Sequence, residues 1–200
     1  MLPKLEFLRK EYHFYLAGGT ALALQIGHRT SLDFDFYSEK KFNNERALRS
    51  FQDRFSRVRL IQNPPDTLIV KAEGVEISLF HYPYPLLKPV VKTLFIDLAS
   101  KEDVAAMKMV AIIQRGVVRD YIDLYFLLEE FPLKKIFQWT KRKFPPFNPY
   151  LGLRALAYFQ DAERDLKQTR FRLLKDVNWE RVKRTILKKV EEFKKEALGK

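Results

Sequence analysis

A glycine pair followed by two alternating aspartates constrains the fold of this chain more than any other feature. The turn sequence GGT occupies residues 18–20, and the run LDFDF follows at residues 32–36. Because strand side chains alternate between two faces, we expect Asp33 and Asp35 to project from one face of a strand. Their apolar neighbours are expected to point the other way, into a core: Leu32, Phe34 and Phe36. The spacer predicts a helix between the turn and this strand.

The same pattern indicates a chemistry. Two close carboxylates repel each other and are usually tolerated when a cation lies between them, and Mg²⁺ binds through one or two carboxylates plus phosphate oxygens of a substrate. Gly18 and Gly19 lack a Cβ, so a backbone turn there can approach a phosphate, and a helix that begins at Thr20 offers free N–H groups. The unit therefore favours phosphoryl or nucleotidyl transfer. The alternative is a surface strand whose acids keep a sheet edge soluble.

The run GGTALALQIGHRTSLDFDFYS resembles the signature of the nucleotidyltransferase AbiEii/AbiGii toxin family, a branch of the polymerase-β-like nucleotidyltransferase superfamily. The segments YPYPLLKP and AAMKMVAIIQRGVVRDYIDLYFLL and the tail containing Trp179 also resemble this family, so the resemblance covers most of the chain. It implies a mixed-sheet nucleotidyltransferase fold and dependence on a divalent metal. It also implies a role as the toxin of a toxin–antitoxin pair, with a cognate antitoxin protein as a partner.

Composition limits the remaining classes. A chain of 200 residues with 46% hydrophobic residues suits one compact core, with or without an appendage. The absence of cysteine excludes disulfides, thiolate zinc sites and cysteine nucleophiles, and it fits a reducing compartment. We see neither a secretory leader nor an apolar run near twenty residues. We therefore expect a cytoplasmic protein without a membrane partner.

Positive charge is concentrated near the C-terminus. The net charge is +12, and residues 132–200 contain 19 Lys and Arg against 8 Asp and Glu. We therefore expect a nucleotidyltransferase-like catalytic core over residues 1–131 and a basic helical C-terminal region over residues 132–200 packed on it. A basic region of this size attracts a polyanion, which favours RNA, such as tRNA, as the acceptor. The alternative is that lysine-rich helices serve solubility or thermostability.

Hydrophobic periodicity predicts an α+β protein in which strands come first and helices follow. This order corresponds to a nucleotidyltransferase-like mixed β-sheet with flanking helices, followed by a helical C-terminal region. Strands are predicted over residues 13–17, 31–36, 55–61, 67–71, 75–80 and 93–96. Helices are predicted over residues 20–26, 44–51, 100–115, 120–130, 133–143, 150–159 and 179–198, with Asn43 or Asn44 capping the second.

A third carboxylate is expected from the resemblance, because polymerase-like transferases usually add one from a neighbouring strand. Glu76 is the candidate, since it lies between Val75 and Ile77 in a predicted strand. The alternative is a solvent-facing residue beside a hairpin turn. In that case Asp33 and Asp35 would hold the metal with water and substrate oxygens.

Two cations lie on an otherwise apolar helical stripe. Positions 104, 107, 108, 111, 112 and 115 share one face of the predicted helix, which places Lys108 and Arg115 among apolar residues. A buried ammonium needs an anionic partner. That partner could be a nucleoside triphosphate, with Lys108 offsetting charge during transfer. The alternative is a structural clamp with Asp120 and Asp123.

The segment RDYID at residues 119–123 resembles the (K/R)D-x-x-D element of the family, which implies that Asp120 belongs to the active-site region. Asp123 is expected to be structural. Arg29 and Ser31 also match the family pattern as candidate nucleotide-binding residues, and Arg29 would either hold a phosphate or pair with Asp33. His28 is either a loop histidine with satisfied hydrogen bonds or an acid–base group.

These predictions combine into one mechanism. Asp33 and Asp35 hold Mg²⁺ or Mn²⁺, the 18–20 turn holds the triphosphate of an NTP, and an acceptor hydroxyl attacks the α-phosphate while Lys108 stabilises charge. The acceptor is an RNA or, in a variant of this hypothesis, a protein. The competing hypothesis is a nucleic-acid-binding or interaction module on a catalytically decayed nucleotidyltransferase scaffold.

Overall fold

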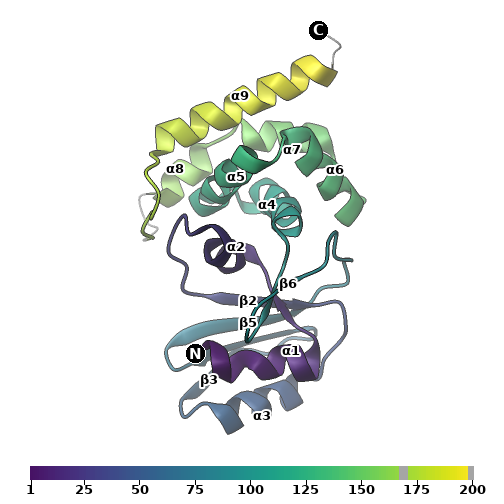
Figure 1. Cartoon of the computed structure of the whole chain (residues 1–200), viewed down its shortest axis with the longest axis vertical. Helices are drawn as coiled ribbons and strands as arrows, with labels where there is room; N and C mark the ends of the chain where they lie inside the picture. The colour runs from purple at the N-terminus through teal and green to yellow at the C-terminus, as the bar shows by residue number, and fades with distance from the viewer. Residues whose placement is uncertain (167–170, 198–200) are drawn as a thin grey trace. The chain divides into compact units, whose positions relative to one another are not determined.

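The chain forms two compact units in the computed structural model, which describes residues 1–166 and 171–197. The first unit contains residues 1–24 and 31–100, and the second contains residues 25–30 and 101–200 (Figure 1). The chain thus passes from one unit to the other three times, and the loop between the glycine turn and the acidic strand belongs to the second unit.

The first unit is built on one mixed sheet of seven strands in the order β3-β4-β5-β2-β1-β7-β6. Neighbours β2 and β5 run parallel, as do β1 and β7, and the other pairs are antiparallel. The strands are β1 (Tyr15–Leu16), β2 (Phe34–Ser38), β3 (Val58–Gln62), β4 (Thr67–Ala72), β5 (Val75–His81), β6 (Val91–Lys92) and β7 (Asp97–Leu98). The predicted mixed sheet of an α+β protein is confirmed.

Four helical elements accompany this sheet: η1 (Leu2–Leu5), α1 (Glu6–Tyr12), α2 (Gly18–Ile26) and α3 (Asn44–Arg54). Helices α1 and α3 lie on one face of the sheet, and α2 lies on the other (Figure 1). The core on the α1 and α3 side includes Phe51, Phe36 and Leu79, each fully buried. The predicted cap of α3 is Asn43, whose side chain accepts a hydrogen bond from the Arg46 N–H at 2.8 Å.

The second unit is helical. It comprises α4 (Lys101–Arg115), α5 (Val118–Glu130), α6 (Leu133–Lys143), α7 (Pro149–Leu156), α8 (Gln160–Leu166) and α9 (Trp179–Ala197). Helix α4 packs against α5, α6 and α7, and α9 packs against the same three helices. A fully buried ion pair joins α4 to α6, with Lys143 Nζ 2.8 Å from Asp103 Oδ1. No helix among residues 1–166 and 171–197 is long and apolar enough to cross a membrane.

Residues 25–30 belong to this helical unit because they pair with a segment that precedes α9. The Thr30 N–H donates to the Arg172 carbonyl at 2.8 Å, and the Leu174 N–H donates to the His28 carbonyl at 2.8 Å. The boundary that packing sets at Ser100 also differs from the boundary at 131 that charge suggests. The distribution of charged residues reflects the protein surface, whereas the packing of the helices places α4 and α5 with the basic helices that follow them.

Several predicted elements differ from the observed ones. The strand predicted over residues 93–96 is wrong, because these residues form the turn between β6 and β7, where the Thr93 hydroxyl bonds to the Ile96 carbonyl. The helix predicted over residues 150–159 ends at Leu156, and α8 is not among the predicted helices. The last predicted helix extends to residue 198, which lies outside the described residues. Tight turns of this kind depend on single side-chain bonds that hydrophobic periodicity does not register.

Candidate active site

The glycine turn lies directly against the carboxylate of Asp35. Strand β1 ends at Leu16 and α2 begins at Gly18, whose φ of +65° is one that residues with a side chain rarely adopt. A Cβ placed on Gly18 would lie 3.4 Å from Asp35 Oδ2. The Ala17 N–H also donates to the Asp35 carbonyl at 3.0 Å. Glycine is therefore favoured here by the backbone conformation, and it lies within van der Waals distance of the acid.

Asp35 lies on the sheet face opposite the core. Phe36 is fully buried, and Phe34 packs against the core cluster, so alternation within β2 directs Asp35 to the other face. Asp33 is exposed and immediately precedes β2, whereas Asp35 is half-buried within it. The expectation that Leu32 points into a core is wrong, since its side chain is 78% exposed. Leu32 precedes the strand, so the alternation of strand side chains does not reach it.

Thr20 connects the start of α2 to the segment that leads into β2. Its hydroxyl lies 2.7 Å from the Ser31 hydroxyl and bonds to the backbone carbonyl of Asp33. Thr20 is buried and its two bonds are part-buried, and they hold Ser31 and Asp33 beside the glycine turn. The structure thus brings the predicted phosphate-binding and metal-binding residues of the first unit into one place.

Glu76 lies on the neighbouring strand β5 and shares a face with Asp35. In the parallel β2–β5 register Phe34 pairs with Ile77, which is fully buried, so Glu76 projects to the opposite, non-core face. Glu76 is exposed. No group of three or more His, Asp or Glu side chains that could hold a metal occurs within residues 1–166 and 171–197. Two carboxylates with substrate oxygens remain the metal-binding arrangement that these residues offer.

In the second unit Asp123 of α5 is the centre of a buried ion network. Its carboxylate accepts hydrogen bonds from Arg29 Nε at 2.7 Å and Arg29 Nη2 at 2.9 Å. Lys108 Nζ lies 2.6 Å away, and His28 Nε2 lies 2.6 Å away. Burial alone would raise the pKa of Asp123, but the charge of Lys108 and the bonds from Arg29 and His28 hold that pKa far below its usual range.

Asp120, one turn earlier on α5, shares Lys108 with Asp123. Lys108 Nζ lies 2.7 Å from Asp120 Oδ1, and Arg115 donates from Nε to Asp120 Oδ2 at 2.9 Å. Burial would raise the pKa of Asp120, and the charges of Lys108 and Arg115 lower it below its usual value. Arg115 is 61% exposed, whereas Lys108 and both aspartates are buried. Three cations, Arg29, Lys108 and Arg115, meet two carboxylates, so the network keeps a net positive charge.

The predicted site residues therefore fall into two groups. The first unit holds Gly18, Gly19, Thr20, Ser31, Asp33, Asp35 and Glu76, and the second unit holds Arg29, Lys108 and Asp120. Of the alternatives for Lys108, the clamp with two aspartates is present. The partner of Arg29 is Asp123, a contact between residues 94 positions apart. The sequence signals for this contact were the adjacent residues His28 and Arg29 and the second acid of RDYID.

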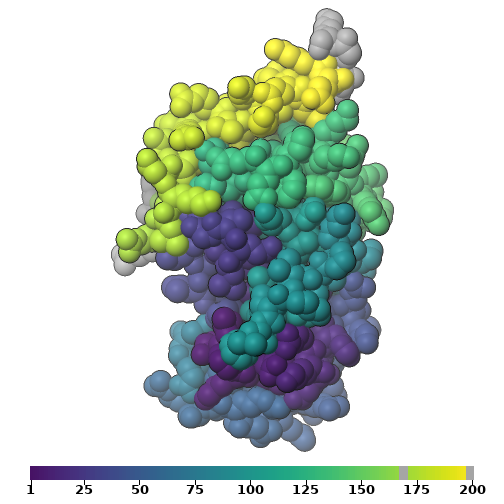
Figure 2. Space-filling view, viewed as in Figure 1, coloured from purple at the N-terminus to yellow at the C-terminus, as the bar shows by residue number. Residues whose placement is uncertain are grey.

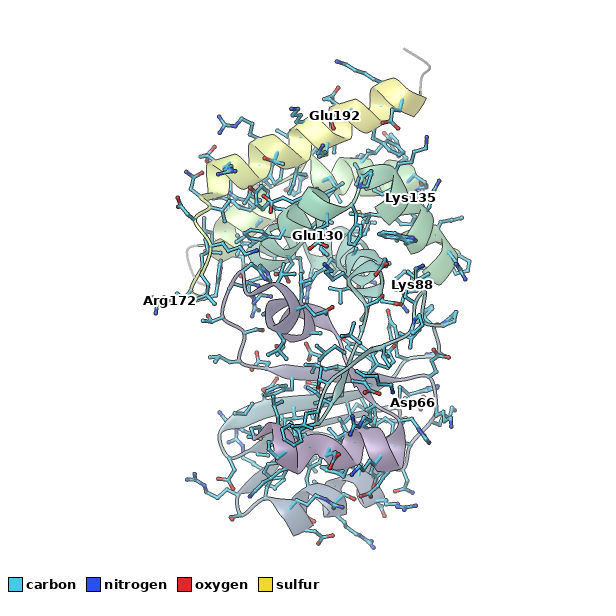
Figure 3. All side chains as sticks on the ribbon, in the orientation of Figure 1. Asp66, Lys88, Glu130, Lys135, Arg172 and Glu192 are labelled. Carbon is cyan, nitrogen blue, oxygen red and sulfur yellow. The ribbon has the colours of Figure 1, made fainter. Side chains whose placement is uncertain are left out.

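Exposed positive charge gathers on α6. Its sequence LKKIFQWTKRK contains no acid, and four of its five cations are exposed: Lys134, Lys135, Lys141 and Arg142. Figure 3 labels Lys135 on this helix and Glu192 on α9. On α9 many lysines pair with acids three or four positions away, as Lys188 does with Glu192 at 3.9 Å. Such exposed pairs contribute little to stability, and the charge of α6 is the less compensated of the two.

Comparison with known proteins gives a consistent result. A family model described as "Nucleotidyl transferase AbiEii toxin, Type IV TA system" matches residues 2–195. An uncharacterized protein of Aquifex aeolicus, aq_aa25, is 39% identical over 188 residues, covering 90% of this chain and 87% of that protein.

Solved structures are similar in fold at low identity. A putative nucleotidyltransferase from Helicobacter pylori superposes with a TM-score of 0.63 at 18% identity, covering 97% of this chain and 91% of that one. MenT4, a nucleotidyltransferase toxin from Mycobacterium tuberculosis, superposes with a TM-score of 0.60 at 15% identity, covering 94% and 80% respectively.

Proposed function

The chain belongs to the AbiEii nucleotidyltransferase toxin family, and from this membership we propose that it moves a nucleotide from an NTP to an RNA acceptor with a divalent metal. The family consists of toxins of toxin–antitoxin systems, so we also propose a cognate antitoxin as a partner of this protein. The observation that supports the chemistry best is the approach of the Gly18 backbone to the Asp35 carboxylate, with a Cβ position only 3.4 Å from Oδ2. A phosphate bound by the turn would therefore lie beside a metal-binding oxygen.

Asp33 and Asp35 fit a divalent metal. They are hard oxygen donors, and Mg²⁺ or Mn²⁺ binds such pairs while taking further oxygens from phosphates and water. When bound, the metal would neutralise phosphate charge and make the attacking hydroxyl more acidic. Glu76 projects from the adjacent strand on the same face as Asp35, but it forms no three-residue cluster with the two aspartates, so the metal site that we propose consists of Asp33 and Asp35.

The remaining residues bind and orient the NTP. The backbone N–H groups at the start of α2, from Gly18, Gly19 and Thr20, would donate to phosphate oxygens. Ser31 would add a hydroxyl donor, and its contact with Thr20 at 2.7 Å keeps it beside the turn.

In the second unit, the net positive network around Lys108 and Asp120 would attract the triphosphate. Arg115 is its most exposed member. Arg29 would act through the same network, since Asp123 fixes its guanidinium.

An RNA acceptor is favoured by the charge of α6. Four exposed cations on one acid-free helix would contact phosphates and release counterions, which gives salt-sensitive binding. The 3′-hydroxyl of such an RNA would be the attacking group. Figure 2 shows α6 and α9 as surface elements of the second unit, accessible to a large ligand.

The proposal is tested by transfer of label from each α-³²P-NTP to tRNA with Mg²⁺ or Mn²⁺. Three proteins are compared: wild type, the Asp33→Asn/Asp35→Asn double variant, and Asp53→Asn, an exposed aspartate on α3. We expect label on RNA with wild type and Asp53→Asn, and none with the double variant.

Two other outcomes contradict the proposal in different ways. Label on a protein instead of RNA would keep the chemistry and replace the acceptor. No label with any NTP, together with equal salt-sensitive RNA binding by all three proteins, would favour the binding module on a decayed scaffold.

A further inference from the structure

The helical unit contains a cavity that shares only Arg115 with the ion network of the proposed transfer site. Its volume is about 600 Å³, within the range of small-molecule sites, and it lies among the C-terminal end of α4, the start of α5, α7 and Asp161 of α8. Its walls are largely apolar and include Ile112, Leu151, Ala155 and Ala157. All of these residues belong to the second unit, so the cavity is defined within that unit alone.

The cavity is held open by bonds in its wall. Tyr121 is buried, and its hydroxyl lies 2.9 Å from the Ala155 carbonyl and 2.7 Å from the Tyr158 carbonyl, to which it donates. These bonds tie the end of α7 to α5. Gly116, with φ of +53°, forms the bend between α4 and α5 on another side, where a Cβ would lie 3.7 Å from the Tyr121 hydroxyl oxygen. The cavity is therefore preformed, which lowers the entropic cost of binding.

Two guanidinium groups line the cavity. Arg154 of α7 is exposed and pairs with no carboxylate among the residues that the structure describes; its guanidinium lies 6.0 Å from the Tyr150 ring centroid. Arg115 of α4 uses Nε and Nη2 on Asp120, yet 61% of its side chain remains accessible, and it forms part of the cavity wall. Guanidinium pairs bind phosphate through several parallel N–H donors.

Aromatic and acidic groups complete the lining. Tyr158 is 47% exposed and Leu151 is 46% exposed, so both offer open apolar surface at the rim. Aromatic side chains next to cations bind bases by stacking, with little dependence on sequence. Asp161 supplies the cavity's carboxylate, which would repel a second phosphate and accept a hydrogen bond from a ribose hydroxyl or a base amino group.

We propose that this cavity binds one ribonucleotide unit of the RNA acceptor, with its phosphate on Arg115 and Arg154 and its base against Tyr158. This assignment rests on the proposed function for the identity of the RNA as acceptor. The charge of one phosphate suits a lining with two guanidinium groups and one carboxylate, and the apolar walls suit a base. Because Arg115 also holds Asp120, occupation of the cavity would influence the buried network directly.

The test is calorimetric titration of the full chain, in the Asp33→Asn/Asp35→Asn background and in EDTA, so that binding at the carboxylates is suppressed. The probes are AMP, CMP, GMP, UMP, a 5′-phosphorylated RNA trinucleotide and inorganic phosphate. Arg154→Ala removes a proposed phosphate ligand, and Ala157→Trp fills the cavity from an exposed position. Arg184→Ala is the matched control, since it removes the same charge from an exposed site on α9 in the same unit.

We expect the trinucleotide and at least one mononucleotide to bind. Affinity should fall about tenfold in Arg154→Ala, as expected for the removal of one charge-assisted phosphate contact, and should be abolished in Ala157→Trp, while Arg184→Ala stays within about twofold for mononucleotides. Circular dichroism of each variant confirms that it is folded.

Several results would overturn the assignment. Equal losses of affinity in Arg154→Ala and Arg184→Ala would mean that only general electrostatic attraction is at work. Inorganic phosphate binding as tightly as nucleotides would mean that the cavity is only an anion site. Mononucleotide binding without trinucleotide binding would make it a site for free nucleotides. The outcome is separable from the proposed function: an empty cavity leaves the labelling result of wild type intact, and binding here survives a failure to transfer label.

Discussion

Replacing Asp123 with asparagine tests how far the buried ion network stabilises the second unit. The carboxylate is fully buried and lies 2.6–2.9 Å from donor nitrogens of His28, Arg29 and Lys108, which are each at most 5% exposed. Asparagine preserves the volume of the side chain but removes its negative charge. Its amide N–H groups, which are donors themselves, would face the three donor side chains. Removing one partner of a buried pair costs about 3–5 kcal/mol, and we expect a loss of unfolding free energy in that range.

Urea denaturation followed by tryptophan fluorescence measures this loss in the right unit. The chain has two tryptophans, Trp139 in α6 and Trp179 in α9, and both belong to the second unit. Asp176→Asn is the matched control, because Asp176 is exposed in the same unit, and it should change stability by less than about 0.5 kcal/mol. A midpoint shift with an unchanged slope would identify a change in stability alone.

A double-mutant cycle isolates the pairwise contribution. Lys108→Met combined with Asp123→Asn should cost at least about 1 kcal/mol less than the sum of the single changes, because the second change no longer strands a buried charge. If Asp123→Asn stays within about 1 kcal/mol of wild type, or if the two changes are additive, the network is not a stabilising unit and our reasoning about it is refuted.

The network also predicts the response to acid. The pKa of Asp123 and that of Asp120 are lowered in the folded state from the ordinary value of 3.8. As pH falls, both carboxylates are therefore protonated in the unfolded chain before they are protonated in the folded protein. The stability that they contribute is therefore complete above about pH 4 and is lost as pH falls toward the folded-state pKa values. Asp123→Asn should show a shallower loss of stability than wild type below pH 4, and an identical pH dependence would contradict this assignment.

Three further outcomes are expected. Gly18→Ala should destabilise the protein and abolish label transfer. Gly27 has a similar φ of +61° and nothing within 4 Å of its Cβ, so Gly27→Ala should cost about 1 kcal/mol from backbone strain alone and keep transfer. Equal effects of the two changes on transfer would contradict the phosphate-binding turn. Lys143→Met, which removes the ammonium 2.8 Å from Asp103, should cost about 3–5 kcal/mol in urea denaturation, while exposed Lys135→Met should be nearly neutral. Replacing the four exposed cations of α6 with glutamine should flatten the salt dependence of RNA affinity by about 0.7 for each phosphate that is no longer neutralised, and an unchanged slope would place the RNA elsewhere.

Local pattern determined much of the first unit. Alternation of apolar residues predicted β2, β4 and β5 to within a few residues, and of the two predicted caps of α3, Asn43 or Asn44, the structure has Asn43. These features depend on neighbours within one turn or one strand, which sequence spacing records directly. The same spacing predicted that Asp35 projects away from the core, and it failed for Leu32 because the strand had not yet begun there.

By itself, the sequence determined the α+β class, the acidic strand beside a glycine turn, and the resemblance that identified the family. Tertiary structure alone decided that β5, the strand of Glu76, lies beside β2, and that residues 25–30 join the helical unit. It also brought the side chains of His28, Arg29 and Lys108 to the carboxylate of Asp123. The physical reason is that a charge buried in the low-dielectric interior is stabilised by an opposite charge beside it, and folding decides which residues lie there. Arg29 and Asp123 meet across 94 positions, and no local periodicity encodes that distance.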